Sequence, residues 1–549
     1  MKIKSIRYGF ANNSSSSHSI VFLGNHKAND DAQGGDFGWD YFTAVNEQSK
    51  KEYLFATLLQ AGKVSSYIPK TTLTEKSGWL NPANRYEAQE KYGFENQGEL
   101  QKSERQSYID YALNIENSIK WEVIQKEFTD VFGKELVDDW MDKDLNKKLG
   151  SWDSGIPYID HQSVLSLPIY ADGRLHIEFL KKFFHILITK NFAILGGNDN
   201  NGDPHKLEEK NTVSDDPTVQ AVQKVLNLIG TENVGPVCVY DEINDDFIIQ
   251  NDRNGNKVRI SFNIDSETKK SAFPELVDLK ITDNCNYGCK FCYQSSTKEG
   301  KHANIENVKS IVKTLSNSRV MEIAIGGGEP TMHPNLLGIL KDIRSRNVIA
   351  CFTTKNFELH TRPDFEEIIK TANSIAFSCN SVAEIEKVKD IKDAISDFGF
   401  PGYEGIAAIY IQMIPELMTD SAFDKALKYI ETNFHRDACV TLLGYKDFGF
   451  GINYKPKNRF QNSDWIDTLK NHSGKYGINF GIDSVLVSKW KNELIEKGVN
   501  PLALVGEEGK FSCYVDAVTM TIHKSSFSKE AGIPLTGQEE TVKEQFATF

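Results

Sequence analysis

Short apolar runs rich in β-branched residues alternate with helical segments between residues 275 and 455, and this alternation limits the possible folds more than any other feature. The six strand candidates are Leu276–Thr282, Val320–Ile325, Val348–Thr354, Ser374–Cys379, Ile406–Met413 and Cys439–Leu443. The expected helices are Ile305–Ser316, Leu336–Arg344, Asp364–Thr371, Val382–Ile395 and Ser421–Asn433. Parallel neighbours need crossover helices, so the pattern predicts a parallel α/β sheet. Because such crossovers are right-handed, the possible architectures are a curved partial barrel and a doubly wound sheet. Both bind ligands at the carboxyl ends of their strands.

The remaining length calls for further domains, because 549 residues exceed what one hydrophobic core normally serves. Residues 1–265 are expected to form a large α+β domain of unknown role, in which residues 1–25 include an exposed tail. Helical patterns occur at Glu47–Ala61 and Ser118–Leu136, and Asp246–Phe262 is typical of a hairpin.

The alternation fades after the sixth unit. Residues 266–455 therefore form the expected core, and residues 456–549 an extension that covers the open side or end of its sheet. Within the extension, Trp465–Leu469 and Ser484–Glu496 have helical patterns, and Phe511–His523 is typical of a strand pair.

Charge and hydropathy exclude some classes of protein. The formal net charge of −13 argues against a surface that coats nucleic acid, although a local basic pocket stays compatible with it. No apolar run approaches the roughly 18–20 residues that span a bilayer. The basic N-terminus lacks a following apolar segment, so no signal peptide is expected and a cytoplasmic location is predicted.

Three of the eight cysteines lie within eight positions, at Cys285, Cys289 and Cys292, directly after the first predicted strand. Thiolates suit iron–sulfur clusters and zinc. Three ligands on one loop can hold three irons of a cubane and leave the fourth iron open for a chelating cofactor. Structural zinc would need a fourth ligand, for which His302 is available, so both readings stay open at this point.

The segment from Asp283 to Tyr293 resembles the cluster loop of the radical S-adenosylmethionine (radical SAM) superfamily, with Phe291 in its aromatic position. The resemblance covers roughly residues 275–455 and does not identify a subfamily. It implies a partial (β/α)6 barrel, a [4Fe–4S] cluster held by the three cysteines, and S-adenosylmethionine as cofactor. It also implies an enzyme that reductively cleaves this cofactor to a 5′-deoxyadenosyl radical, which abstracts hydrogen from a substrate.

The second predicted strand runs directly into three glycines at Gly326, Gly327 and Gly328, followed by Glu329. Glycine lets the backbone approach a ligand closely, although a simple turn would need glycine as well. By resemblance to the Gly-Gly-Glu-Pro stretch of the family, these four residues are expected to bind the cofactor.

Two later strand ends add weaker candidates by the same resemblance. Thr354 ends the third strand, where a lysine is inserted into the family pattern, and Ser378 ends the fourth. A purely structural role is the alternative for both.

The other cysteines are spread along the chain, which favours a single cluster. Cys513 is the one candidate for a catalytic thiol near the radical, and a buried structural thiol is the alternative. Two polar segments, Asn12–His18 and Asp160–Ser163, carry no supporting motif.

The substrate is expected to be a peptide or protein, with a nucleotide or another small molecule as the alternative. A binding protein stabilised by zinc or a cluster, without radical chemistry, is the rival from another class. The enzyme reading requires an electron donor such as a flavodoxin or ferredoxin, and the N-terminal domain is expected to recruit substrate or act as a lid.

Overall fold

The structure is a computed structural model that describes most of the C-terminal half of the chain and parts of the N-terminal half. The described residues are 2–7, 19–32, 36–37, 42–64, 121–139, 158–159, 167, 169–170, 176–196, 214–229, 237–251, 255–261, 268–398, 406–434, 439–454, 463–472, 479–504, 506–535 and 539–549. The segments Asn12–His18 and Asp160–Ser163 lie outside them.

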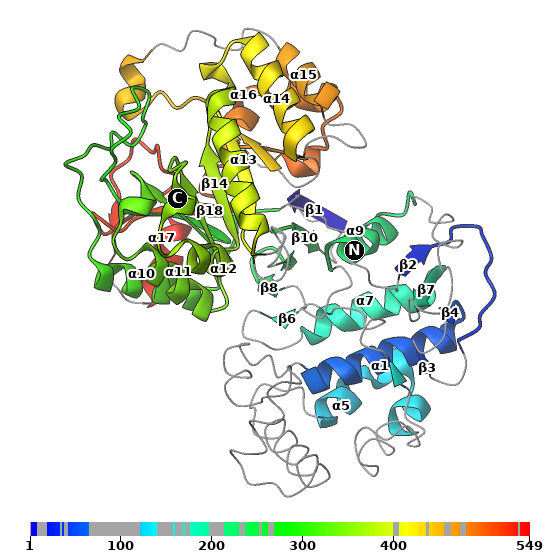
Figure 1. The fold of residues 1–549 in the computed structure, drawn as a ribbon. Helices are drawn as coiled ribbons and strands as arrows, with labels where there is room; N and C mark the ends of the chain where they lie inside the picture. Colours follow the sequence, from blue (N-terminus) through cyan, green and yellow to red (C-terminus); the bar gives the residue numbers. More distant parts are fainter. Residues whose placement is uncertain are drawn as a thin grey trace, which may run out of the picture. The chain divides into compact units, whose positions relative to one another are not determined.

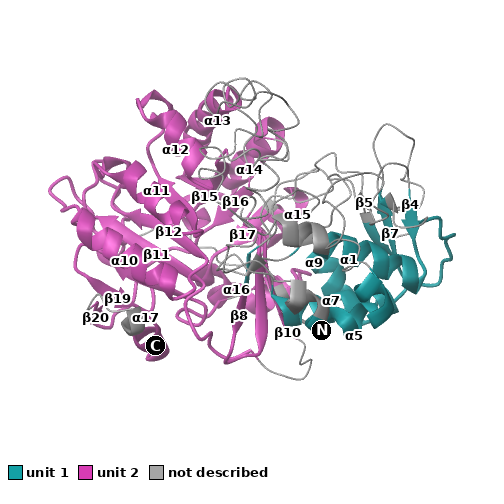
Figure 2. Ribbon diagram, turned by 90° about the horizontal axis from the view of Figure 1, so that it is seen from below, with its two compact units in different colours: residues 1, 13–238 teal, residues 2–12, 239–549 magenta. Residues whose placement is uncertain are grey.

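The chain forms two compact units, residues 13–238 with residue 1, and residues 2–12 with residues 239–549 (Figure 2). The expected boundary between residues 265 and 266 falls inside the second unit. The reason is the ion pairing of the predicted hairpin, described below.

The first unit combines a small sheet with helices. Its antiparallel sheet has the order β2 (Ser19–Phe22), β7 (Phe192–Gly196), β4 (Phe42–Ala44). The helices are α1 (Glu47–Val64), α5 (Trp121–Phe132), α7 (Ile177–Thr189) and α9 (Pro217–Ile229), and the short strands are β3 (Asp36–Phe37), β5 (Tyr158–Ile159) and β6 (Ile169–Tyr170). Buried phenylalanines pack between the helices, with ring centroids of Phe132 and Phe184 5.8 Å apart. The described part of this unit thus contains both helices and strands.

The predicted hairpin belongs to the second unit. The strands β8 (Val237–Asp241), β9 (Asp246–Gln250), β10 (Lys257–Ser261) and β1 (Lys2–Arg7) are neighbours in one sheet. The fully buried Arg259 pairs with Asp241 at 2.8 Å and also with Glu275, which directly precedes the first strand of the core. A buried guanidinium requires its carboxylates, so these pairs tie the hairpin to the core.

All six predicted strands form one parallel sheet in the second unit, of which β14 (Ser374–Ser378) is labelled in Figure 1. They are β11 (Leu276–Thr282), β12 (Glu322–Gly327), β13 (Ile349–Thr354), β14 (Ser374–Ser378), β15 (Ala408–Met413) and β16 (Cys439–Leu442). The crossover helices are α10 (Ile305–Asn317), α11 (Leu336–Ser345), α12 (Phe365–Thr371), α13 (Val382–Ser396) and α14 (Asp420–Phe434). The predicted mixed α/β core is confirmed, and its strand order is consistent with a partial barrel.

The C-terminal segment extends this sheet at both edges. β17 (Asn479–Ile482) pairs in parallel with β16, whereas β18 (Ser512–Asp516) pairs in parallel with β11. The other elements are α15 (Asp464–His472), α16 (Ser484–Glu496), β19 (Thr521–His523), β20 (Ile533–Pro534) and α17 (Glu539–Ala547), with 3₁₀ turns η1 (Pro330–Met332), η2 (Leu359–Thr361), η3 (Pro415–Leu417), η5 (Gly449–Asn453) and η6 (Pro501–Ala503). Residues 456–549 therefore supply strands to the sheet as well as peripheral helices.

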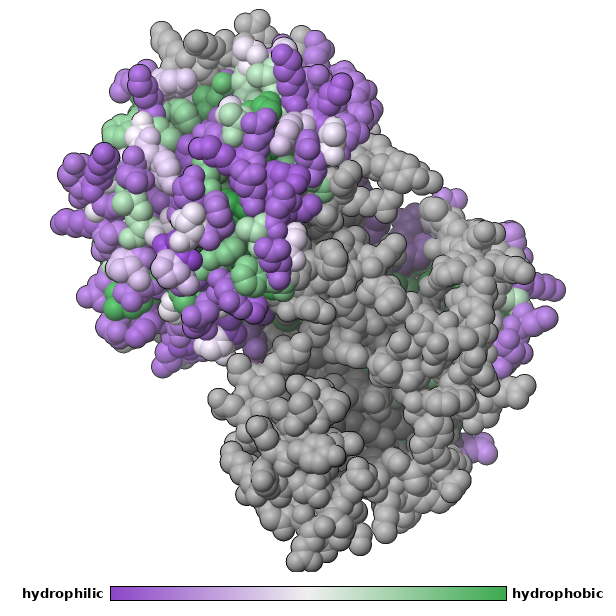
Figure 3. Space-filling view, in the orientation of Figure 1, coloured by the Kyte–Doolittle hydropathy of each residue, from purple (hydrophilic) through white to green (hydrophobic). Residues whose placement is uncertain are grey.

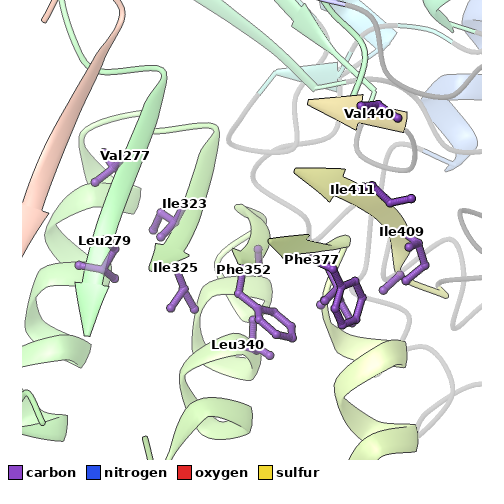
Figure 4. Close-up of a cluster of buried hydrophobic side chains, with 14 of the residues drawn as sticks. Val277, Leu279, Ile323, Ile325, Leu340, Phe352, Phe377, Ile409, Ile411 and Val440 are labelled. Carbon is purple, nitrogen blue, oxygen red and sulfur yellow. The ribbon is translucent and has the colours of Figure 1, made fainter. Parts of the chain in front are cut away.

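Successive side chains of each core strand point to opposite faces of the sheet, and the two faces have different surroundings. Outward side chains such as Leu279, Ile325 and Phe352 are buried against the helices (Figure 4). Each fully buried aliphatic or phenyl side chain of this kind contributes about 1.5–3 kcal/mol of transfer free energy. The inward positions carry small or polar residues, which cannot fill the concave side of the sheet, and a hollow remains there.

Side chains that accept backbone N–H groups cap three helices of the second unit, whereas α11 and α12 lack such a hydrogen bond. Asn304 caps α10, Ser381 caps α13, and Asp483 caps α16. Hydrophilic side chains dominate the coloured surface in Figure 3. In the part of the chain that the structure describes, no helix has the length and hydropathy to cross a membrane.

Candidate functional site

A cavity of about 750 Å³ opens on the concave side of the parallel sheet. It contains ten of the eleven candidate residues predicted from the sequence, and these come from the cysteine loop and the carboxyl ends of three strands. They are Cys285, Cys289, Phe291, Cys292, Gly326, Gly327, Gly328, Glu329, Thr354 and Ser378. The fold thus brings together segments that lie up to a hundred residues apart in the chain.

The cysteine loop is held by its own backbone. The Cys285 N–H donates to the Thr297 carbonyl at 2.8 Å, and the Cys292 N–H donates to the Cys289 carbonyl at 3.1 Å. Gly288 has a φ of +60°, a conformation that side chains disfavour, and it turns the loop between the first two cysteines. The three cysteines are half-buried, so the cavity that they line is only partly open to solvent.

Burial raises the pKa of the Cys285 and Cys289 thiols, and nearby acidic groups add to the effect. Both are therefore protonated in the metal-free protein near neutral pH, and metal binding has to release their protons.

The zinc alternative requires a fourth ligand beside the three cysteines. Among the described residues, no three His, Cys, Asp or Glu side chains approach closely enough to bind one ion together. A cluster does not require this, because each thiolate binds a different iron. His302, the alternative fourth ligand, contacts the Thr282 hydroxyl at 2.8 Å and stacks edge-on against His333.

The three glycines have different surroundings. A Cβ on Gly328 would lie 2.8 Å from the Asn284 carbonyl carbon, and one on Gly327, whose φ is +120°, would lie 2.9 Å from Cγ of Lys280. A Cβ on Gly326 would meet no atom within 4 Å and would enter the cavity. Gly328 thus allows close packing on the cysteine loop and Gly327 on β11, whereas Gly326 leaves room for a ligand.

The Glu329 carboxylate is buried and connects two strand ends. Its Oε1 accepts from the Thr331 N–H at 3.0 Å, from the Thr331 hydroxyl at 2.7 Å and from the Thr354 hydroxyl at 2.6 Å. Its Oε2 accepts from the Lys355 N–H at 2.9 Å, and the residue lines the cavity. Thr354 therefore orients Glu329 with its hydroxyl.

The next strand end is organised by an ion pair. The Lys355 ammonium contacts Glu384 at 2.6 Å, and Glu384 also accepts the Asn380 N–H at 2.6 Å. Ser378 is the last residue of β14. It is half-buried and lines the cavity.

The loop after β16 contacts the cysteine loop directly. The Phe450 N–H donates to the Cys292 carbonyl at 2.9 Å. Gly449 has a φ of +54°, and a Cβ there would collide with the Tyr293 carbonyl. The ring of Phe291 packs edge-on against Tyr454, with centroids 5.8 Å apart.

Cys513 is the one candidate that does not line the cavity. It pairs with Val277 in register and lies in the hydrophobic core, while its neighbours Ser512 and Tyr514 face the cavity. Burial strongly raises the pKa of its thiol. This position gives no support to a catalytic role.

The cavity also contains charged residues that were not among the candidate site residues from the sequence. Asp278 and Lys446 both line the cavity, the first from β11 and the second from the loop after β16. A signal for Asp278 existed, because a charged residue inside the apolar run Leu276–Thr282 must face a polar space or a partner.

The cavity lining is acidic overall. It has no arginine or histidine among the described residues and contains four lysines against seven carboxylates. These are Lys257, Lys280, Lys355 and Lys446, and Glu275, Asp278, Glu322, Glu329, Asp483, Glu507 and Glu508.

A family model matches the part of the chain that contains this site. The family model described as Radical SAM superfamily matches residues 279–401, which contain the cysteine loop and the glycine-rich strand end. Residues 279–401 are a radical SAM domain. The cofactors of this superfamily are a [4Fe–4S] cluster and S-adenosylmethionine, as expected from the sequence.

Curated relatives of the radical SAM domain are similar over short stretches. The GTP 3′,8-cyclase of Pasteurella multocida is 29% identical over 87 residues, which cover 15% of this chain and 26% of that protein. The chain thus spans about a quarter of the cyclases that it matches. The uncharacterized protein MJ0907 of Methanocaldococcus jannaschii is 23% identical over 209 residues, 36% of this chain and 71% of the relative.

Among solved structures, Streptococcus suis SuiB bound to S-adenosylmethionine is similar, with a TM-score of 0.38 and 14% identity. The alignment covers 66% of this chain and 76% of SuiB.

Proposed function

We propose that this protein is a radical SAM enzyme that uses one [4Fe–4S] cluster and S-adenosylmethionine to abstract hydrogen from a peptide or protein. The observation that carries the proposal is the shared cavity, in which three cysteine thiols face the glycine-rich strand end and Glu329. When bound, the cluster and S-adenosylmethionine supply a 5′-deoxyadenosyl radical that takes a hydrogen atom from the substrate.

The residues of the chain have separate tasks in this proposal. Cys285, Cys289 and Cys292 hold the cluster. The backbone at Gly326 leaves space for the cofactor, and the Glu329 carboxylate accepts from its amino group. The concave sheet surrounds the reaction and limits solvent access.

A single cluster is supported by the positions of the other cysteines. Cys238, Cys351, Cys379, Cys439 and Cys513 lie on or directly after five different strands, and all but Cys351 are buried. A second all-cysteine cluster would need four thiolates gathered at one place.

The charge of the cavity bears on the substrate. A nucleoside triphosphate such as GTP needs cationic side chains around its phosphates. Of the four lining lysines, three already pair with carboxylates, namely Lys257 with Glu275, Lys280 with Asp516 and Lys355 with Glu384. The acidic lining therefore favours a neutral or cationic substrate over GTP.

Anaerobic reconstitution followed by iron analysis tests the proposal. We expect about four irons per chain, broad absorbance near roughly 400 nm, and 5′-deoxyadenosine after addition of a reductant such as reduced flavodoxin. Cys285→Ala should lose both iron and cleavage, whereas Cys439→Ala, a cysteine-to-alanine control outside the loop, should retain them. A colourless protein that binds one zinc would contradict the proposal.

A further inference from the structure

Asp278 is a carboxylate without a partner on the inner face of the sheet. In register it lies between Ala324 of β12 and Tyr514 of β18. Its side chain is exposed to solvent inside the cavity that it lines, and it makes no hydrogen bond or ion pair with any described residue. Desolvation by the surrounding protein raises the pKa of Asp278 to about 6; Lys446 opposes this shift, and Glu508 and Glu322 reinforce it.

Lys446 does not neutralise this carboxylate by direct contact. Its ammonium lies over the rings of Tyr293 and Phe527, 4.5 and 4.8 Å from their centroids, with no carboxylate oxygen within 4.0 Å among the described residues. Burial alone would lower the pKa of Lys446, but Tyr293 and the surrounding acids, Asp483 foremost among them, outweigh burial and raise it. Lys446 thus stays charged, and the rings hold it.

The other nearby acids are partly satisfied by the protein. Asp483 accepts the N–H groups of Gly444 and Leu486, both at 2.9 Å, and Glu508 accepts from the Ser484 hydroxyl. The negative charge that lacks a hydrogen-bond donor is therefore concentrated on Asp278.

The neighbours of Asp278 leave space in front of it. Ala324, Cys351 and Ser374 continue the same row across the sheet, and all three are small and line the cavity. The row lies two residues, or about 7 Å, below the level of Gly326. A ligand at Asp278 is therefore in a layer next to the proposed cofactor position and separate from it.

We propose that Asp278 is a specificity-determining residue that binds an ammonium or guanidinium group of the substrate, such as a lysine or arginine side chain. The inference rests on the proposed function, because it assigns the second layer of the cavity to the substrate. The bound cation would supply the charge-assisted donors that the carboxylate lacks.

Calorimetry on the anaerobically reconstituted full-length protein, saturated with S-adenosylmethionine, tests this assignment. The probes are Nα-acetyl-lysine amide, Nα-acetyl-arginine amide and the neutral Nα-acetyl-norleucine amide. We expect at least one basic probe to bind about tenfold or more tightly than the norleucine probe, as a charge-assisted hydrogen bond provides. Asp278→Asn should abolish this preference and keep the affinity for S-adenosylmethionine. Asp390→Asn, the same change at an exposed position of α13, should alter neither.

Four outcomes would overturn the assignment. They are equal binding of the norleucine probe, unchanged binding of basic probes to Asp278→Asn, loss of cofactor affinity in that variant at an unchanged melting temperature, and no binding of either basic probe up to about 10 mM. Failure of the wild-type protein to take up a cluster would contradict the proposed function instead, and the same titrations on the cluster-free protein would still test Asp278.

Discussion

Alanine substitutions at the three consecutive glycines should have opposite consequences, because their surroundings differ. Gly328→Ala places a methyl group against the Asn284 backbone of the cysteine loop, an overpacking that costs about 1–3 kcal/mol. In Gly327→Ala, the alanine must also adopt a φ of +120°, and this backbone strain lowers the unfolding free energy by a further amount of about 1–3 kcal/mol. Gly326→Ala meets no protein atom, and the smaller conformational entropy of its unfolded chain stabilises it by up to about 1 kcal/mol.

Two measurements separate stability from ligand binding in this series. Thermal unfolding of the cluster-free proteins should give melting temperatures in the order Gly326→Ala, Gly328→Ala, Gly327→Ala, from highest to lowest, with differences of about 2–4 °C per kcal/mol. Calorimetry on the reconstituted proteins should show a weaker affinity for S-adenosylmethionine in Gly326→Ala, because its methyl group occupies cavity space. The reasoning is refuted if Gly326→Ala unfolds as early as Gly328→Ala, or if Gly328→Ala is as stable as the wild type.

Three further variants test other parts of the site. Glu329→Gln should lower the unfolding free energy by about 1–3 kcal/mol, seen in thermal unfolding, because an amide cannot accept all four hydrogen bonds. Since the pKa of Asp278 is raised from 3.8 to about 6 in the fold, its ionisation begins to cost stability as the pH rises above about 4, and the full cost is present above about pH 6. Asp278→Asn should therefore be more stable than the wild type at pH 8, by at most about 1 kcal/mol after solvent screening, and the advantage should shrink as the pH falls below 6 and vanish near pH 4. Cys513→Ala should keep its iron content and cofactor cleavage while its melting temperature falls; loss of cleavage with iron retained would restore the thiol as a catalytic candidate.

Much of the core followed from local sequence. The strand Leu276–Thr282 and the helix Ser484–Glu496 have the predicted bounds, because side-chain periodicity reflects which face is buried. The cysteine loop and Gly326–Glu329 were also recognisable, since ligand chemistry and glycine conformations depend on short segments.

Other properties depend on contacts between distant segments. The pairing of β17 and β18 with opposite edges of the core sheet could not be predicted, because sequence periodicity does not specify a strand's neighbour. The position of Cys513 behind the sheet, and not in the cavity, follows from the register of β18 alone.

The sequence by itself determined the chemistry of the cluster loop, because the ligands and their spacing lie within eight residues. Only the tertiary structure decided what faces the substrate. Asp278 and Lys446 lie 168 positions apart in the chain, and the carboxylate is left without a partner because the fold holds the Lys446 ammonium over the rings of Tyr293 and Phe527.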